Sequence, residues 1–259
     1  MSVEYALNGD VALITLNRPA TYNAIEASLS TNLRQALERA GRESRAAILT
    51  GAGKAFCSGA DLNDLLADYE TGDGPNLADL LEDVFHPALQ ALLECQVPVV
   101  GAINGVAAGA GLGLALACDL RVMAEDAFLT SAFTAIGLAP DSGTTWWLPH
   151  NLGVSRAMEF ALTNRRIGAQ ESRDLGLCLD VVPAQSLLGR AMEVATDLAD
   201  LVPDALVTTR RLIRQAAGSS FDQALQAEQA EQGRLGRTGE HREGVLAFTE
   251  KRKPEFRSR

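Results

Sequence analysis

The fold is decided by two stretches rich in small residues, Phe56-Cys57-Ser58-Gly59-Ala60-Asp61-Leu62 and Asn104-Gly105-Val106-Ala107-Ala108-Gly109-Ala110-Gly111-Leu112-Gly113. Each follows a predicted strand, Ala46–Thr50 for the first and Val99–Ile103 for the second, and each leads into a predicted helix. Small residues at the start of a helix leave its backbone N–H groups exposed and approachable. If the two stretches face each other, they provide two donors for one carbonyl oxygen, which is the geometry of an oxyanion hole.

A nucleotide-binding turn is the main alternative for these glycines, and the spacing disfavours it. The run Gly109-Ala110-Gly111-Leu112-Gly113 has the pattern GxGxG, whereas dinucleotide-binding turns have GxGxxG. The P-loop signature, which ends in Gly-Lys followed by Ser or Thr, is absent from the sequence. The second stretch is therefore interpreted as a source of backbone donors.

The composition is that of an ordinary globular protein. The chain has 259 residues, of which 47% are apolar and 22% are charged. This length fits one large domain, or one domain with a small appendage, and the apolar content excludes a disordered chain. The formal net charge is −10, so a nucleic-acid partner is not expected, because duplex-binding proteins carry a basic face.

The sequence also predicts a cytoplasmic protein without a membrane or metal partner. The longest apolar candidate, residues 97–118, is interrupted by Asn104 and five glycines, so it is not a membrane span. The first residues lack the basic and apolar parts of a signal peptide. The four cysteines form no CxxC pair and the three histidines lack ligand spacing, which predicts reduced thiols and no metal site.

The rest of the chain alternates strand and helix patterns and then becomes helical, which predicts an α/β fold with a helical C-terminal part. Asn8-Gly9 joins two alternating segments into a predicted hairpin, and Asp68–Asn76 is predicted as a loop and a mobile segment. The other expected strands are Asp119–Met123 and Phe128–Thr130. The expected helices are Ala27–Ala40, Leu77–Leu93, Thr144–Leu152, Val154–Thr163, Ala169–Leu175 and most of the chain from Pro183 to Lys251.

Taken together, several motifs resemble the crotonase (enoyl-CoA hydratase/isomerase) superfamily. They are Leu16-Asn17-Arg18-Pro19, the two glycine-rich stretches, Leu116-Ala117-Cys118-Asp119, Gly137-Leu138-Ala139-Pro140-Asp141 and the C-terminal run from Glu243 to Arg252. The resemblance covers nearly the whole chain in order. It implies a spiral of ββα units over residues 1–183 with an acyl-CoA site. It also implies a helical region over residues 184–259 for trimerisation and CoA contact, in a homotrimer or hexamer.

The resemblance implies roles for particular residues and no cofactor besides the coenzyme A of the substrate. The backbone N–H groups of Ala60 and Ala110 correspond to the pair that polarises the thioester carbonyl. Ala24, Asp61 and Leu62 correspond to positions that line the CoA. Phe248 and Lys251 correspond to CoA contacts from the C-terminal helix, often that of a neighbouring subunit.

The two glutamates that activate water in hydratases of this family have no counterpart here. Their positions correspond to Gly113 and Phe133, and neither side chain is a carboxylate. Hydration by the usual route is therefore not expected. Phe133 is instead expected to line the acyl pocket.

Asp141 is the candidate acid/base. Its setting, Pro140-Asp141-Ser142-Gly143-Thr144-Thr145, resembles that of the ring-epoxide phenylacetyl-CoA isomerases, which also shift enoyl-CoA double bonds. One carboxylate suffices to take a proton from C2 and return it to C4. An apolar neighbour such as Phe133 is expected to raise the pKa of this carboxyl by desolvation. The alternative is an aspartate that only caps the following helix.

His86 leaves more than one interpretation open. In the chlorobenzoyl-CoA dehalogenases of the family, the nucleophilic aspartate matches Asp141 and a histidine base matches His86, but a tryptophan stands where this chain has Phe133. A packing or surface histidine is the simpler interpretation of His86. The resemblance also allows an atypical hydratase, a thioesterase and a non-catalytic acyl-CoA-binding or RNA-binding homologue. Asp141 and the acidic charge of the chain disfavour the non-catalytic homologue.

The C-terminus is basic although the protein is acidic. Only Lys54, Lys251 and Lys253 are lysines, and five cations lie in the last nine residues. Because CoA carries several negative charges, the cluster Lys251-Arg252-Lys253 is expected to face an anionic ligand.

Overall fold

Two sheets, connected by a chain that passes repeatedly from one to the other, form the centre of the protein. The computed structural model describes residues 1–72 and 74–256. One sheet has the strand order β1-β2-β3-β5-β7-β10 and the other has the order β4-β6-β8-β9. The strands are β1 Val3–Asn8, β2 Val11–Leu16, β3 Ala46–Gly51, β4 Ala55–Cys57, β5 Val99–Ile103, β6 Val106–Ala108, β7 Leu120–Ala124, β8 Phe128–Thr130, β9 Ile167–Gly168 and β10 Asp180–Val182.

Consecutive strands of the chain alternate between the sheets. β3, β5 and β7 lie in the large sheet, and the strand that follows each of them, β4, β6 and β8, lies in the small one. β3, β5 and β7 pair in parallel, and so do β4, β6 and β8. The β1–β2 hairpin and the β8–β9 pair are antiparallel. β3 and β5 are buried over their whole length, as central parallel strands are. This alternation, interrupted by helices, is the expected ββα spiral.

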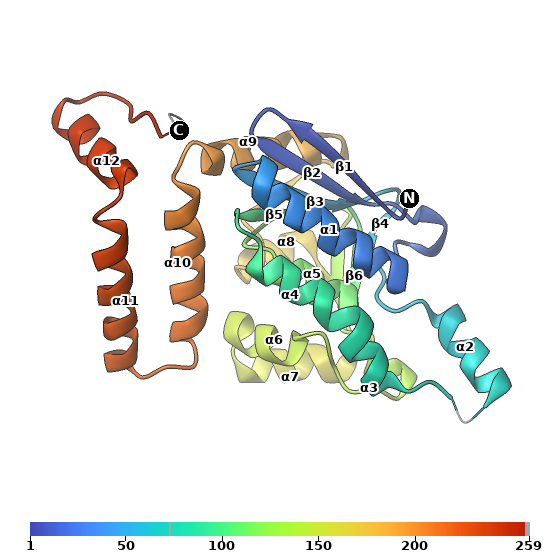
Figure 1. Cartoon of the computed structure of the whole chain (residues 1–259). Coiled ribbons are helices and arrows are strands. Elements are labelled where there is room, and N and C mark those ends of the chain that lie inside the picture. The colour runs from blue at the N-terminus through green and yellow to red at the C-terminus, as the bar shows by residue number, and fades with distance from the viewer. Residues whose placement is uncertain (73, 257–259) are drawn as a thin grey trace.

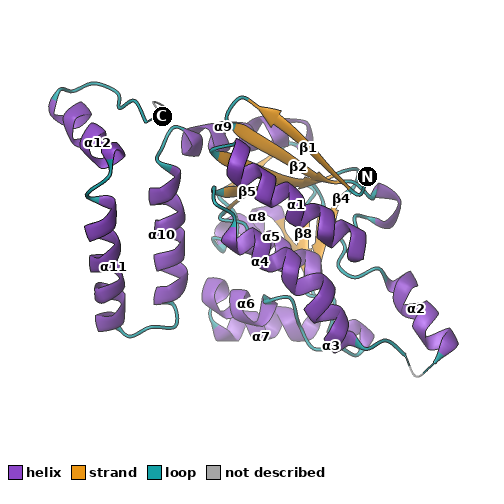
Figure 2. Cartoon of the chain, in the orientation of Figure 1, coloured by secondary structure: helices purple, strands orange, loops and turns teal. Residues whose placement is uncertain are grey.

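Most helices pack around the sheets, whereas the last helices of the chain extend away from them (Figures 1 and 2). α1 buries Leu29, Leu33 and Leu37 at helical spacing, and α9 buries Leu187 and Ala191 among others. The helices are α1 Ala27–Glu43, α2 Leu62–Thr71, α3 Leu77–Leu80, α4 His86–Glu94, α5 Ala110–Ala117, α6 Thr144–Leu152, α7 Val154–Thr163, α8 Ala169–Asp174, α9 Leu187–Ala199, α10 Pro203–Ala216, α11 Phe221–Leu235 and α12 Gly239–Thr249.

The helical region after residue 184 has two parts. α9 packs on β3, β5 and β7 of the large sheet, whereas α10, α11 and α12 extend from the body of the protein (Figure 1). The Asp119 carboxylate anchors α10, because it accepts from Arg210 at 3.0 Å and from Arg214 at 2.9 Å. The two guanidinium groups also donate to main-chain carbonyls, among them those of Cys95 and Ala117. α10 is thus tied to the body by charge-assisted hydrogen bonds.

The structure corrects two local expectations. α2 continues to Thr71, so the predicted Asp68–Asn76 loop is helical in its first part, and residue 73 lies outside the described residues. The predicted Leu77–Leu93 helix is divided by a π-helical segment, Leu81–Phe85, directly before His86 and Pro87. Proline has no N–H to continue the regular α-helical bonding, so the backbone widens there.

The four cysteines are free and buried, as expected. Burial raises the pKa of the Cys57 and Cys118 thiols to about 12, so they stay protonated at neutral pH. In the ranges 1–72 and 74–256, none of the helices has the length and apolar character needed to cross a bilayer.

Candidate active site

A cavity of about 430 Å³ lies where the two glycine-rich stretches meet the α3–α4 region and the chain before α6. Its walls are mostly apolar. The apolar wall includes Leu80, Leu81, Phe85, Phe133, Ile136 and Leu138. Of the carboxylates in the described ranges, only Asp61 and Asp141 line it. Such a cavity suits an apolar ligand held by a few polar groups.

The two glycine-rich stretches touch each other through glycine. A Cβ atom on Gly59 would lie 2.9 Å from the carbonyl oxygen of Ala108 and 3.3 Å from the amide nitrogen of Ala110. Gly59 and Gly109 also have positive φ angles of 95° and 54°. The backbone conformation therefore favours glycine at both positions, and the close approach requires it at Gly59.

The backbone at Ala60 and Ala110 presents N–H groups without partners in the described chain. Ile25 donates to the Gly59 carbonyl at 2.7 Å and accepts from the Asp61 amide at 3.3 Å. In such a parallel bridge the N–H of the residue between, Ala60, points away from Ile25. Ala110 is the first residue of α5, so its N–H has no acceptor within the helix. Both residues line the cavity, as the oxyanion-hole hypothesis requires.

Asp141 lies at the cavity, half-buried, and does not cap a helix. The N-cap of α6 is Gly143, and only the main-chain carbonyl of Asp141 accepts from Thr144. The capping alternative is therefore wrong for the carboxylate. Its Oδ1 accepts a hydrogen bond of 2.6 Å from the Ser142 hydroxyl. Burial raises the pKa of Asp141, and the Ser142 hydrogen bond and the charge of His86 oppose this increase.

His86 is exposed and is absent from the residues that line the described cavity. It is the first residue of α4, directly after the π-helical segment, and its charge acts on Asp141 from there. The structure thus brings His86 into the electrostatic environment of the carboxylate without making it part of the cavity wall.

Gly113 and Phe133, the positions expected to correspond to the two hydratase glutamates, are both closely packed. A Cβ on Gly113 would lie 2.4 Å from the carbonyl oxygen of Ser142, so α5 and the start of α6 meet at this glycine. Phe133 is buried, lines the cavity and places its ring edge 3.9 Å from the Cβ position of Gly109. At position 113 the site therefore has a close contact with the Ser142 backbone, and at position 133 it has an apolar ring.

Comparison with known proteins identifies the family. The family described as enoyl-CoA hydratase/isomerase matches residues 6–259. The chain belongs to the crotonase (enoyl-CoA hydratase/isomerase) superfamily. Its relatives act, by their names, in both of the reactions that give the family its description.

Three relatives cover almost all of this crotonase chain. A Rhodobacter capsulatus protein named "Probable enoyl-CoA hydratase" is 42% identical, with 100% of this chain and 98% of that protein aligned. An Escherichia coli 1,2-epoxyphenylacetyl-CoA isomerase is 37% identical, with 95% and 94% aligned. The crystal structure of an enoyl-CoA hydratase from Bacillus anthracis matches with a TM-score of 0.92 at 33% identity, with 100% of both chains covered. The expected fold is confirmed, whereas similarity alone does not select the isomerase branch.

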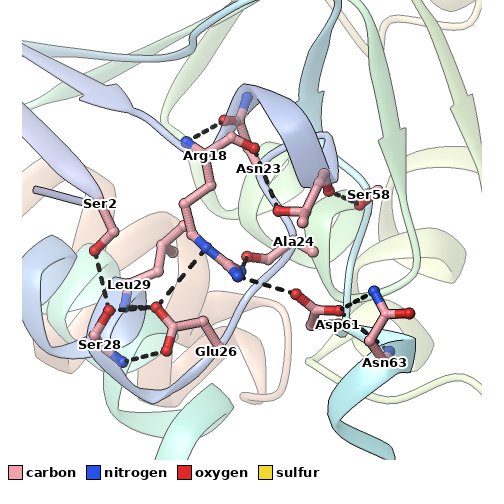
Figure 3. Close-up of polar contacts among 11 residues, drawn as sticks. Ser2, Arg18, Asn23, Ala24, Glu26, Ser28, Leu29, Ser58, Asp61 and Asn63 are labelled. Atoms are coloured by element: carbon pink, nitrogen blue, oxygen red, sulfur yellow. Dashed lines mark hydrogen bonds and ion pairs between the residues drawn. The ribbon is translucent and has the colours of Figure 1, made fainter. Parts of the chain in front are cut away.

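Arg18 links two segments that line this crotonase site, although the sequence alone indicated no role for it (Figure 3). Its guanidinium donates to the Ala24 carbonyl at 2.6 Å and to the Asp61 carboxylate at 3.0 Å. The other oxygen of Asp61 accepts from the backbone N–H of Asn63 at 3.2 Å and so caps α2. Ala24, Asp61 and the exposed Leu62 line the cavity, and their contact with CoA stays a prediction. Both oxygens of the Asp61 carboxylate thus accept hydrogen bonds from the protein itself.

Arg18→Gln is expected to lower the free energy of unfolding by about 2 kcal/mol and to weaken acyl-CoA binding. The substitution leaves the buried Asp61 carboxylate without its cation and frees the loop at Ala24. Arg173→Gln is the control, because its pair with Asp180 is long, at 3.6 Å, and exposed, so the loss should stay below about 0.5 kcal/mol. Chemical denaturation and calorimetric titration measure both effects; equal losses in the two variants would contradict this role.

Phe248 and Lys251 lie at the C-terminal end of the chain, far from this cavity. α12 and α2 are at opposite ends of the molecule in Figure 1, and neither residue lines the cavity. Phe248 is 85% exposed. Two members of the basic cluster make ion pairs within the chain, since Arg252 pairs with Glu243 at 2.6 Å and Lys253 pairs with Asp200 at 2.9 Å. Lys251 makes no side-chain ion pair or hydrogen bond with the described residues.

Proposed function

We propose that this crotonase-family protein is an acyl-CoA isomerase that uses the Ala60 and Ala110 N–H groups and the single carboxylate of Asp141. The observation that carries the proposal is which carboxylates line the cavity and how each is hydrogen-bonded. Arg18 and the α2 cap engage both oxygens of Asp61, so Asp141 is the one lining carboxylate of the described chain with an oxygen that accepts no hydrogen bond from the protein. One carboxylate suits a proton shift, in which the same group takes and returns the proton.

The proposed mechanism begins with the thioester carbonyl accepting hydrogen bonds from both N–H groups. Asp141 then removes a proton from C2 of a 3-enoyl-CoA, and the two donors stabilise the dienolate oxygen. The protonated Asp141 returns the proton to C4, which leaves the double bond between C2 and C3. Each donor contributes on the order of 3 kcal/mol to such a transition state. Burial raises the pKa of Asp141 and so brings its basicity closer to neutral pH, where proton transfer is most effective.

The cavity wall supports a neutral acyl group. The residues expected around the acyl chain are Leu80, Leu81, Phe85, Phe133 and Leu138, and none of the described lining residues is a lysine or arginine. A terminal carboxylate on the acyl chain would be buried without a cation, which is costly. Apolar enoyl groups and the ring epoxide of a phenylacetyl group both meet this requirement.

An atypical hydratase is the second candidate, because the relative with 42% identity carries that name. The positions of Gly113 and Phe133 oppose it, since the two residues supply no carboxylate for activation of water. A dehalogenase-like hydrolase would use Asp141 as nucleophile and His86 as base, and the exposed position of His86 outside the cavity wall gives it less support.

Turnover of two substrate types separates these candidates. Purified protein is incubated with trans-3-hexenoyl-CoA and, separately, with crotonyl-CoA, and products are identified by mass spectrometry and NMR. The isomerase proposal expects conversion of the first substrate to 2-hexenoyl-CoA without the mass increase of a water molecule. Hydration of crotonyl-CoA at a rate equal to or above isomerisation would overturn it. 1,2-Epoxyphenylacetyl-CoA, tested in parallel, distinguishes double-bond from ring-epoxide rearrangement.

We further propose that Phe248 and Lys251 contact the CoA of a neighbouring subunit in a homotrimer or hexamer. Their distance from the cavity of their own chain and the exposure of Phe248 support this arrangement. Lys251→Gln is then expected to raise the KM for a CoA thioester about fivefold, since a phosphate loses its cation, without changing the KM for a pantetheine thioester. Lys253→Gln, on the same segment but paired with Asp200, is the control. A monomer in analytical ultracentrifugation would contradict this proposal.

A further inference from the structure

We propose that Ser142 is a positioning residue that holds Oδ1 of Asp141 and thereby reserves Oδ2 for the substrate proton. This inference deepens the proposed function, on which it rests. The Ser142 hydroxyl donates to Oδ1 at 2.6 Å, which is a short, charge-assisted hydrogen bond. No hydrogen bond or ion pair among the described residues engages Oδ2 in the same way, so the two oxygens of the carboxylate are not equivalent.

The backbone at Ser142 is held in a conformation that serine rarely adopts. Its φ angle is 51°, in the left-handed region, and the following Gly143 is also left-handed with a φ of 75°. Glycine at residue 143 adopts this conformation freely, whereas a serine at residue 142 is strained. Such strain persists only where the surrounding structure enforces it, and here the hydrogen bond to Asp141 and the burial of Ser142 hold the residue in place.

Packing against α5 fixes the position of Ser142. The side chain is only 2% exposed, and the Cβ position of Gly113 lies 2.4 Å from the Ser142 carbonyl oxygen and 3.0 Å from its Cβ. Any side chain at residue 113 would push Ser142 away from the helix. The same glycine that removes the first hydratase glutamate therefore allows the serine to reach the carboxylate.

The two groups that stabilise the Asp141 carboxylate come from two different elements. Ser142, on its own segment, and His86, on α4, both stabilise the carboxylate, whereas burial disfavours it. Loss of the Ser142 hydroxyl removes one stabilising contribution, so the pKa of Asp141 is expected to rise. A base with a higher pKa is protonated over more of the acidic range. The acidic limb of the kcat profile should consequently move to higher pH.

The test combines Ser142→Ala with Ser142→Gly. Both variants remove the hydroxyl, but only glycine relieves the left-handed backbone. The pKa of Asp141 is measured by NMR of the ¹³C-labelled carboxyl group, and the acidic limb of kcat is measured with 3-hexenoyl-CoA. We expect both quantities to rise by about one pH unit in both variants, so that kcat falls about tenfold on the acidic limb, at pH values below the carboxyl pKa of the unmodified protein. Ser172→Ala, which removes a buried hydroxyl on α8, is the control and should change neither.

The test of Ser142 can succeed or fail independently of the proposed isomerase function. An unchanged carboxyl pKa in both variants would overturn the role of Ser142, whatever the activity. A shift in Ser142→Ala that disappears in Ser142→Gly would also overturn it, since backbone strain would then be the cause. If the carboxyl pKa shifts as expected but Asp141→Asn stays active, the proposed isomerase mechanism fails while the coupling of Ser142 to Asp141 stands.

Discussion

Asp141→Asn is expected to lower kcat for 3-enoyl-CoA isomerisation about 10³-fold while the protein stays folded. The amide keeps the shape of the side chain and still accepts the Ser142 hydrogen bond through its oxygen, but it cannot take a proton from C2. General acid–base catalysis contributes about 10² to 10⁴ in rate, and here one group performs both transfers. The measurement is kcat together with the Kd of a CoA thioether analogue, which should change little.

The sign of the stability effect of this substitution follows from the pKa of Asp141. Burial raises that pKa in the folded protein, so the stabilising effect of the protonated carboxyl is present at low pH and is lost as pH rises through the folded-state value. At neutral pH the ionised carboxylate costs stability, and the neutral amide does not. The melting temperature of Asp141→Asn should therefore equal or exceed that of the unmodified protein.

Asp126→Asn is the matched control for Asp141→Asn. Asp126 is exposed in the turn between β7 and β8, away from the cavity, so the same substitution there should leave kcat unchanged. Asp141→Asn protein that is folded and keeps more than a tenth of the original kcat would remove Asp141 from the mechanism. An equal loss in both variants would indicate a nonspecific effect of the substitution.

Gly113→Ala is expected to lower the free energy of unfolding by about 3 kcal/mol. The added Cβ would lie 2.4 Å from the main-chain oxygen of Ser142, and neither α5 nor the backbone before α6 can yield as a flexible side chain would. Overpacking of this kind costs about 1 to 3 kcal/mol. The outcome is measured by urea denaturation, and a change below about 0.5 kcal/mol would contradict the closeness of this contact.

Gly189→Ala is the control for Gly113→Ala. Gly189 lies in α9, and a Cβ added there meets no atom within 4 Å in the described structure. Alanine in a helix loses less conformational entropy than glycine, so this variant should gain about 0.5 to 1 kcal/mol. The opposite signs of the two alanine substitutions separate the effect of packing from that of helix propensity.

The close contact between Gly113 and the Ser142 backbone also limits whether hydratase activity can be introduced. Gly113→Glu, alone or with Phe133→Glu, places glutamate at one or both of the positions that the resemblance predicts for the hydratase glutamates. We expect these variants to be destabilised further and to show no crotonyl-CoA hydration, because the backbone of Ser142 occupies the space that the first glutamate would need. A folded variant that hydrates crotonyl-CoA would show that the backbone can rearrange to admit the carboxylate.

Much of the fold could be predicted because the signals are local. Asn8-Gly9 marks the hairpin, and continuous apolar runs mark the buried strands β3 and β5. Strands of the small sheet were missed, because β4, β6 and β9 have only three, three and two residues. β8, also of three residues, is predicted correctly as Phe128–Thr130, whereas β4 overlaps the first glycine-rich stretch, β6 lies within the second, and neither has a strand pattern of its own. Only pairing with distant chain segments defines such short strands.

The sequence by itself determined the family, the glycine-rich stretches and the residue types at Gly113, Phe133 and Asp141. The tertiary structure alone decided which groups meet. Arg18 reaches Asp61 across 43 residues, Gly113 admits the backbone of Ser142, and α12 lies away from the cavity of its own chain. The physical reason is that residue type and spacing act along the chain, whereas burial, ion pairing and steric exclusion depend on segments that only folding brings together.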